Sequence, residues 1–196
     1  MNRIRLLLAF GTILVAMAIA PLAQASSGMG TLELNAGYAK SSDDQTGNDD
    51  KLGGGLSFGG AFWRNVSPMF TLGLDVSYDD LGKIEYNNGN TANNKVSAHI
   101  LRVNPALRVN FGQGTGANFY AQGGAGLYNV TVKLDDSIFG SLANTDGKFG
   151  FNIGAGAGFP VGEKARLNFT GLYHSVATDG ENTTYLGFKA GIGFGI

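Results

Sequence analysis

The chain has 196 residues, a formal net charge of −1 and no cysteine, which excludes disulfides, zinc–thiolate sites and thiol catalysis. Its 14 basic residues are scattered along the sequence and form no block, so the usual footprint of a nucleic-acid-binding protein is missing. Glycine is abundant, at 32 residues against four prolines, and has no collagen-like period of three. It alternates with Phe, Leu, Ala and Tyr, as a strongly curved sheet requires.

The N-terminal segment has the features of a secretory signal peptide. Arg3 and Arg5 form a basic start, an almost unbroken apolar run follows over residues 6–22, and an A-x-A cleavage site ends at Ala25. We therefore predict a signal peptide over residues 1–25 and one mature domain over residues 26–196. The alternative, an uncleaved anchor, is disfavoured by the short run and the processing site. No later segment approaches the roughly 20 continuous apolar residues of a spanning helix, so the mature chain can cross a membrane only as strands.

Alternation of apolar and polar residues marks eight segments in the mature part. A period of two is typical of β-strands with one apolar face. In the fifth segment the phase shifts near Tyr128, which indicates a bulge. The predicted strands cover residues 30–39, 52–64, 69–78, 96–111, 118–132, 148–161, 165–176 and 185–196.

The seven connections between these segments alternate in character. Those after the second, fourth and sixth segments are tight, whereas the others are polar and mostly long, such as 41–50 and 79–94. Short periplasmic turns alternating with longer external loops are typical of outer-membrane barrels, and an even strand count places both termini on the periplasmic side. Most of the 15 acidic residues fall in the external connections. These acidic residues either belong to solvated loops or make cation-mediated contacts to lipopolysaccharide phosphates.

Aromatic residues gather near the strand ends, as expected for rings at both interfaces of a membrane. A soluble barrel such as a lipocalin is the alternative, and it would reverse the faces and have an apolar interior. The residues toward the outer end are Tyr38, Tyr78 and Tyr173, and those toward the inner end are Phe62, Phe70, Phe111, Phe159 and Phe194.

The last segment carries a second export feature. Lys189, Gly191, Phe194 and Ile196 follow the order polar-x-Gly-x-x-apolar-x-apolar. This order resembles the C-terminal β-signal of bacterial outer-membrane barrels, which usually ends in Phe where this chain ends in Ile. The resemblance implies that these four residues act as an assembly signal.

The mature chain as a whole resembles small eight-stranded outer-membrane barrels of the OmpA and OmpX type, with OmpW as a more distant likeness. The resemblance rests on the alternating pattern and on segments 119–128 and 149–159, which look like middle strands of the outer-membrane β-barrel domain family. It implies fold and location. It does not imply an activity, since the family contains adhesins, structural proteins, channels and enzymes.

The residues of each strand that alternate with the apolar ones should line the lumen, and several of them are charged. Charges in a narrow eight-stranded lumen are costly unless they are paired and hydrogen-bonded. We therefore predict a salt-bridged polar interior that plugs the barrel, in which Asp75, Arg102 and Lys189 share one height. A continuous pore is the alternative. The predicted lumen charge network consists of Glu33, Asp75, Arg102, Arg108 and Lys189.

The adjacent residues His174 and Ser175 invite comparison with outer-membrane lipid A deacylases, whose His and Ser sit two apart on one strand. Neighbouring residues on a strand point to opposite faces, so this imidazole cannot easily activate this hydroxyl. The other histidine, His99, is assigned to a different face from His174, which disfavours a metal site. We predict no enzyme activity, no cofactor and no metal.

The sequence thus predicts an all-β protein: an eight-stranded antiparallel up-and-down transmembrane β-barrel, preceded by a cleaved signal peptide, in the outer membrane of a Gram-negative-type cell. The expected role is structural or surface-interacting. A narrow channel or carrier for small solutes, hydrophobic ones included, is the alternative, and a lipid A-modifying enzyme is the third. The expected partners are the bilayer, lipopolysaccharide, the outer-membrane assembly machinery and an extracellular ligand at the external loops, with no nucleic acid; we expect a monomer.

Overall fold

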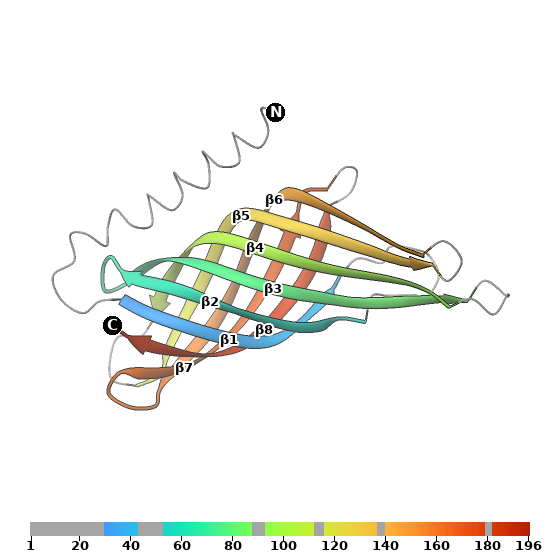
Figure 1. Cartoon of the computed structure of the whole chain (residues 1–196). Helices are drawn as coiled ribbons and strands as arrows, with labels where there is room; N and C mark the ends of the chain where they lie inside the picture. Colours follow the sequence, from blue (N-terminus) through green and yellow to red (C-terminus); the bar gives the residue numbers. More distant parts are fainter. Residues whose placement is uncertain (1–29, 43–52, 88–92, 112–115, 137–139, 179–181) are drawn as a thin grey trace.

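The computed structural model describes residues 30–42, 53–87, 93–111, 116–136, 140–178 and 182–196 (Figure 1). The predicted signal peptide, residues 1–25, lies outside this part. Across the described residues, no helix has the length and hydropathy needed to cross a bilayer. The strands are β1 (Gly30–Ser41), β2 (Gly55–Asn65), β3 (Phe70–Asn87), β4 (Asn93–Phe111), β5 (Asn118–Asp136), β6 (Gly140–Pro160), β7 (Ala165–Val176) and β8 (Thr183–Gly195).

The eight strands form one closed barrel in sequence order. Each strand pairs antiparallel with the next, and β8 pairs with β1, where Leu32 lies opposite Phe194. Gly30 and Ile196 extend this seam by exchanging two backbone hydrogen bonds, N–O 2.9 and 3.3 Å. Closure leaves no free edge around the barrel wall, as a sheet in hydrocarbon requires. The predicted fold class is confirmed (Figure 1).

The two faces of the wall differ in polarity, and strand β8 shows the pattern. Its outward residues Leu186, Phe188 and Phe194 are exposed, whereas Tyr185 and Lys189 are buried on the inner face. The other strands repeat this arrangement, with exposed Leu and Phe outside and polar side chains inside. A belt of exposed apolar side chains around a polar interior is stable in lipid and not in water. This is the reverse of a soluble barrel with an apolar lumen.

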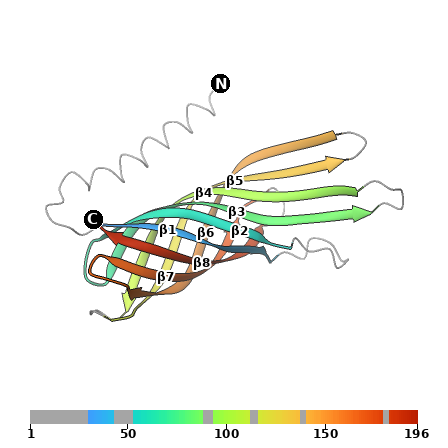
Figure 2. The same cartoon turned by 60° about the horizontal axis from the view of Figure 1, so that its bottom comes forward.

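Strands β3 to β6 are much longer than predicted. The third predicted strand ended at residue 78, but β3 continues to Asn87, and β4, β5 and β6 are longer at the same end. The connection expected at 79–94 is therefore mostly strand. Figure 2 shows the hairpins β3–β4 and β5–β6 reaching well beyond the ends of β1, β2, β7 and β8. We call this extension, residues 80–87, 93–100, 129–136 and 140–149, the projecting sheet.

The predicted phase shift near Tyr128 is wrong. The register of β5 against β6 is unbroken from Asn118 to Asp136, and Tyr128 points into the lumen like other even-numbered residues of β5. The irregularity lies instead in β3, where the register against β4 shifts between Asp80 and Lys83. Gly82 provides the positive φ of 87° at this bulge, a conformation that glycine adopts without steric cost.

Candidate functional site: the closed lumen and the projecting sheet

A first buried ion pair lies toward the end of the barrel where Gly30 meets Ile196. The Arg108 guanidinium donates to both oxygens of the Glu33 carboxylate, at 2.9 and 3.3 Å, and also to Gln122 at 2.9 Å. Asn168 donates to the same carboxylate at 2.9 Å. The ring of Trp63 lies 3.7 Å from the guanidinium carbon. Every side of this ion pair is therefore satisfied by a hydrogen bond or an aromatic face, as a buried pair requires.

A second and larger network surrounds Asp79, which is 1% exposed. One carboxylate oxygen accepts from Arg102 Nε at 3.0 Å and from the Tyr185 hydroxyl at 2.9 Å. The other accepts from the Ser57 hydroxyl and lies 3.4 Å from Lys189 Nζ. Residues from four strands, β2, β3, β4 and β8, thus converge on one carboxylate.

Asp75 completes the charge balance of this second network. Its carboxylate lies 3.3 Å from Arg102 Nη1 and accepts from the Ser77 hydroxyl at 2.7 Å. Ser77 in turn accepts from Arg102 at 3.1 Å and from Lys189 at 2.8 Å. Two carboxylates, Asp75 and Asp79, thus face two cations, and the group as a whole is neutral. Neutral pairing is what makes buried charge tolerable in a low-dielectric interior.

Aromatic residues cross the lumen beside this network. The Tyr128 hydroxyl accepts from Asn104 at 2.8 Å and from Asn152 at 3.3 Å, and it lies 3.2 Å from His174 Nδ1. With both lone pairs used, the hydroxyl hydrogen is left for Nδ1, which makes Nδ1 the acceptor and leaves the imidazole hydrogen on Nε2. The His174 ring also stacks on Tyr185, with ring centres 4.2 Å apart. These contacts make His174 part of the lumen packing.

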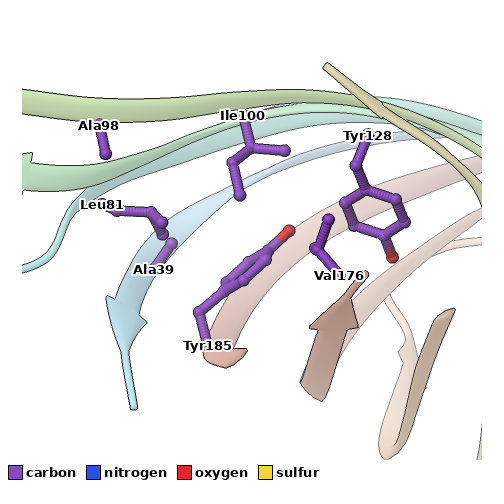
Figure 3. Packing of buried hydrophobic residues seen from close by; sticks show 7 residues of the cluster. All are labelled: Ala39, Leu81, Ala98, Ile100, Tyr128, Val176 and Tyr185. Carbon is purple, nitrogen blue, oxygen red and sulfur yellow. The ribbon is translucent and has the colours of Figure 1, made fainter. Parts of the chain in front are cut away.

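An apolar cluster closes the lumen at the end nearest the projecting sheet. Figure 3 shows its side chains meeting across the barrel from β1, β3, β4, β5, β7 and β8. Ile100 and Val176 are 0% exposed, and Val130 packs against the group. We call this cluster the apolar lid; it consists of Ala39, Leu81, Ala98, Ile100, Tyr128, Val176 and Tyr185.

The lid and the two networks leave the middle of the barrel filled with side chains. Arg102, Asn104 and His174 are 0% exposed, which places them out of reach of solvent from either end. Among the described residues, no cluster of His, Asp and Glu has the composition to hold a metal ion.

The projecting sheet carries a row of apolar side chains on one of its two faces. Cross-strand pairing places Ile84 opposite Val96, Val96 opposite Leu134, and Leu134 opposite Leu142. This apolar row lies on the same face as the lumen side chains, because Val96 shares the parity of Ile100 and Arg102 on β4. Leu134 and Leu142 are 41% and 67% exposed. Single exposed apolar residues are common, but a row across four strands of an extramembrane sheet is a contact surface that needs an explanation.

The other face of the projecting sheet is polar. Register places Lys83, Ser97 and Lys133 in one row, and Lys95 opposite Asp135 in the next. The ion pair of 2.8 Å between Asp146 and Lys148 does not belong to this face, because Asp146 lies opposite Val130 and so shares the face of the apolar row. Charged residues of both signs on the polar face keep it out of the hydrocarbon, so the projecting sheet stands above the membrane.

The structure places all five charges of the predicted lumen set inside the barrel. It brings Asp75, Arg102 and Lys189 together and puts Glu33 and Arg108 in a separate pair. Sequence analysis missed Asp79, because the predicted third strand ended one residue too early. The alternation through Asp75 and Ser77 points to Asp79 as the next inward residue, and that signal was available.

The residues of the other sequence hypotheses also have definite places. His174 is in the lumen, and Ser175, its neighbour on β7, has the opposite parity. His99 faces outward, with its ring 5.5 Å from that of Tyr78. The structure therefore brings neither histidine to a serine nor the two histidines to one face.

The proposed assembly-signal residues lie on both faces of β8. Lys189 and Gly191 are buried on the inner face, while Phe194 and Ile196 are 42% and 65% exposed on the outer one. The apolar half of the signal is thus free to contact lipid or another protein, while the polar half is engaged inside.

A closed barrel with a lipid-facing belt, a polar lumen and eight antiparallel strands matches one family. The profile described as "Outer membrane protein beta-barrel domain" aligns with residues 8–195. The chain belongs to this family. The family places the protein in the cell outer membrane, as the sequence resemblance implied. A search of curated protein sequences gave no match.

Solved outer-membrane barrels share the fold at low sequence identity. Neisserial surface protein A is 15% identical, with a TM-score of 0.57 over 85% of this chain and 97% of the other. Ail, the attachment invasion locus protein of Yersinia pestis, was solved with the heparin analogue sucrose octasulfate. It is 16% identical, with a TM-score of 0.51 over 86% of this chain and 99% of Ail. At these identities the likeness establishes the fold.

Proposed function

We propose that this barrel is a surface-interaction protein, which anchors the projecting sheet in the outer membrane and presents it to an extracellular macromolecule. The observation that carries the proposal is the apolar row of the projecting sheet, in which Leu134 and Leu142 are exposed and Ile84 and Val96 are half-buried. An exposed apolar patch with a polar surround is typical of an interaction site.

The closed lumen supports binding at the surface over transport. A channel needs a continuous polar path, but the apolar lid lies across the outer end and neutral ion-pair networks fill the middle. A carrier of hydrophobic solutes needs an apolar cavity, whereas the lumen below the lid is polar. Planar-bilayer recording tests this point, and we expect no discrete conductance steps from the purified protein.

An enzymatic role finds no support in the same geometry. His174 is enclosed by Tyr128 and Tyr185, and Ser175 belongs to the other face of β7. His174 is hydrogen-bonded to a tyrosine and not to the serine that lipid A deacylation would need, and the serines that donate to carboxylates, Ser57 and Ser77, are buried in the lumen. Expression in a host with defined lipid A, followed by mass analysis of that lipid, should show no change.

The distribution of charge on the projecting sheet indicates which kind of partner it would bind. Ail was solved with a sulfated sugar. Here lysines and acidic residues are mixed on the projecting sheet, so it lacks the uniform positive field that a polyanion needs. We therefore assign the contact to apolar side chains, with the charges setting orientation. The charged residues with described side chains are Asp80, Lys83, Lys95, Lys133, Asp135, Asp146 and Lys148.

The test compares two double variants at the same height of the sheet. Leu134→Ser with Leu142→Ser removes the apolar row, and Lys133→Ser with Ala143→Ser alters the opposite face as a matched control. Cells that display equal amounts of each barrel are measured for retention on immobilised matrix proteins and glycans, and for clumping with one another. We expect the first variant to lose retention and the control to keep it. Equal retention by wild type and the leucine variant would refute the proposal.

The remaining expectations about partners are part of the same proposal. Lipopolysaccharide would contact the outer wall near Lys40 and His99, where the apolar belt ends and polar residues begin. The assembly machinery would recognise the exposed Phe194 and Ile196 on β8. A monomer is expected, since the barrel is closed by its own strands. Crosslinking in intact membranes measures all three associations.

A further inference from the structure

The opposite end of the barrel contains a cavity of about 470 Å³ that the proposed surface role does not use. Gly30, the first described residue, meets Ile196 at this end of the barrel, and the projecting sheet is at the other, so the cavity faces the periplasm. Its floor is formed by Arg108, Trp63 and Tyr120, and its rim by the β2–β3 turn, where Asn65 and Pro68 are exposed. Its size falls within the roughly 300–1,000 Å³ of small-molecule pockets.

Glycines on the inner face of β6 explain why this end has room. At Gly156 a Cβ would lie 2.4 Å from the Tyr120 hydroxyl, so the ring occupies the space of a side chain. Tyr120 is fixed there by a 2.6 Å hydrogen bond to Thr170. At Gly158 a Cβ would lie 2.6 Å from the Asn168 side chain. The wall therefore recedes on one side, and polar side chains from the facing strands line the space.

The lining is rich in groups that both donate and accept hydrogen bonds. Four asparagine amides and several hydroxyls face the cavity, and each amide offers a donor pair and an acceptor. Two buried polar atoms in the lining, Trp63 Nε1 and Asn118 Oδ1, have no hydrogen-bond partner within the described structure. One is a donor and the other an acceptor, which suits ligand groups such as hydroxyls and amides. The polar lining residues are Thr31, Asn65, Ser67, Thr71, Asn110, Asn118 and Asn168.

The charge of the lining is positive. Arg108 and Arg166 both contribute to it, and no acidic residue does. Arg108 is already neutralised by Glu33. Arg166 instead donates to two backbone carbonyls, of Gly116 at 3.3 Å and Gly158 at 3.2 Å, which leaves its charge without a carboxylate among the described residues. An anionic group is the ligand feature that would balance it.

We propose that this cavity binds a carboxylated, acylated amino sugar from the periplasmic side. The carboxylate would pair with Arg166, while the hydroxyl and amide groups would meet the asparagines, Trp63 Nε1 and Asn118 Oδ1. Trp63 and Tyr120 are 2% and 3% exposed and their rings pack on Arg108, so they form a rigid floor beneath the sugar, which the polar groups above them would bind. This site is independent of the projecting sheet, so either proposal can fail without the other.

The test uses the full-length protein folded in detergent, with N-acetylmuramic acid as the probe. Trp63 is the chain's single tryptophan, so intrinsic fluorescence reports directly on the cavity. We expect a saturable fluorescence change with a Kd of about 1 mM or tighter. N-acetylglucosamine, which lacks the carboxylate, should bind at least about tenfold more weakly, because it loses a charge-assisted hydrogen bond.

Two variants separate binding from folding, and a third serves as control. Arg166→Gln should weaken binding about tenfold or more. Asn65→Asp keeps the oxygen that accepts from Thr71 at 2.8 Å, yet adds a negative charge at the rim and should also weaken binding. Lys164→Gln removes an exposed cation of the adjacent turn that does not line the cavity, and should bind like wild type. A heat-dependent gel shift confirms that each variant is folded.

Three results would overturn the proposal. The first is the absence of a saturable change with N-acetylmuramic acid in both fluorescence and ligand-observed NMR. The second is equal competition by acetate, which would make the cavity a site for small anions without sugar recognition. The third is unchanged binding in folded Arg166→Gln and Asn65→Asp, which would mean that the sugar binds elsewhere.

Discussion

Replacing Asp79 with Ala is the sharpest test of how the lumen is stabilised. The carboxylate is shared by Arg102, Lys189, Tyr185 and Ser57, and it is 1% exposed. Without it, two buried cations would be opposed by one carboxylate, and two hydroxyls would lose their acceptor. Removing one partner of a buried ion pair costs about 3–5 kcal/mol, and we place this variant near the upper end of that range.

Asp75→Ala should cost less, about 3 kcal/mol, because Arg102 keeps its bond to Asp79. Asp146→Ala is the control: its carboxylate is 57% exposed, so solvent screens its ion pair with Lys148, and we expect a change within about 0.5 kcal/mol. Lys189→Met in the Asp79→Ala background restores charge balance and should recover about 2 kcal/mol.

The assay is urea unfolding in detergent micelles, followed by the fluorescence of Trp63 and by the heat-dependent gel shift. Both readouts should give the same order of stability: wild type, then the Asp75 variant, then the Asp79 variant. An Asp79→Ala protein within about 1 kcal/mol of wild type would show that water or rearranged side chains replace the carboxylate. In that case the buried network would contribute no net stability.

Three further outcomes are expected. Gly73→Ala should destabilise the barrel by about 1–3 kcal/mol, since a Cβ there would lie 2.2 Å from the Trp63 ring; Gly123→Ala, with its nearest atom at 3.7 Å, should be neutral in the same urea titration. Deleting residues 194–196 should make the chain accumulate in the periplasm, be degraded and lose the gel shift, and normal amounts in the outer membrane would contradict the assembly signal. N-terminal sequencing of membrane-extracted protein should begin at Ser26, whereas retention of Met1 would mean that the signal peptide is not cleaved.

The period-two alternation predicted much of this structure because one physical rule governs every strand of a membrane barrel. Lipid accepts only apolar side chains on the outer face, so parity alone assigns Glu33, Arg108 and Lys189 to the interior. The same rule gives the strand number and the closure of β8 on β1. The rule holds within the membrane, where the outer face of every strand contacts lipid and the inner face contacts the lumen.

Above the membrane this rule no longer applies, and there the predictions failed. Past residue 78 the outer face of β3 meets water, so Asp80 and Lys83 interrupt the apolar pattern and resemble a loop. The strand nevertheless continues, because its backbone pairs with β4 as far as Asn87 opposite Asn93. Pairing between backbones leaves little trace in side-chain hydropathy. The bulge at Gly82 then changes the parity of β3, so that even-numbered residues lie on the face that odd-numbered residues occupied before it. A count of alternating residues from the membrane-spanning part cannot detect this change.

The apolar lid was missed for a related reason. Ile100 and Ala98 share the inward parity of Arg102, and the sequence pattern of one strand does not distinguish a lid residue from a residue of the polar network. Their role depends on their position along the barrel axis, which is the same as that of Leu81, Val176 and Tyr185 on other strands. This position follows from the register between strands, and register is set by many pairings together. The partners in the two ion-pair networks were equally hidden, because parity identifies the charges but not which of them meet.

The lid and the apolar row form one continuous surface, and this continuity bears on function. On β4 the inward residues Ile100, Ala98 and Val96 follow one another from the lid into the projecting sheet, and on β5 Val130 and Leu134 do the same. In the part of the chain that the structure describes, a molecule that contacts the apolar row meets the apolar lid at the barrel mouth, with the buried ion-pair networks beneath it. Such a surface can hold a partner in place, but it gives that partner no route inward. The filled lumen thus separates the apolar row at the outer end of the barrel from the polar cavity at the periplasmic end. Each of these two surfaces can be altered without disturbing the other.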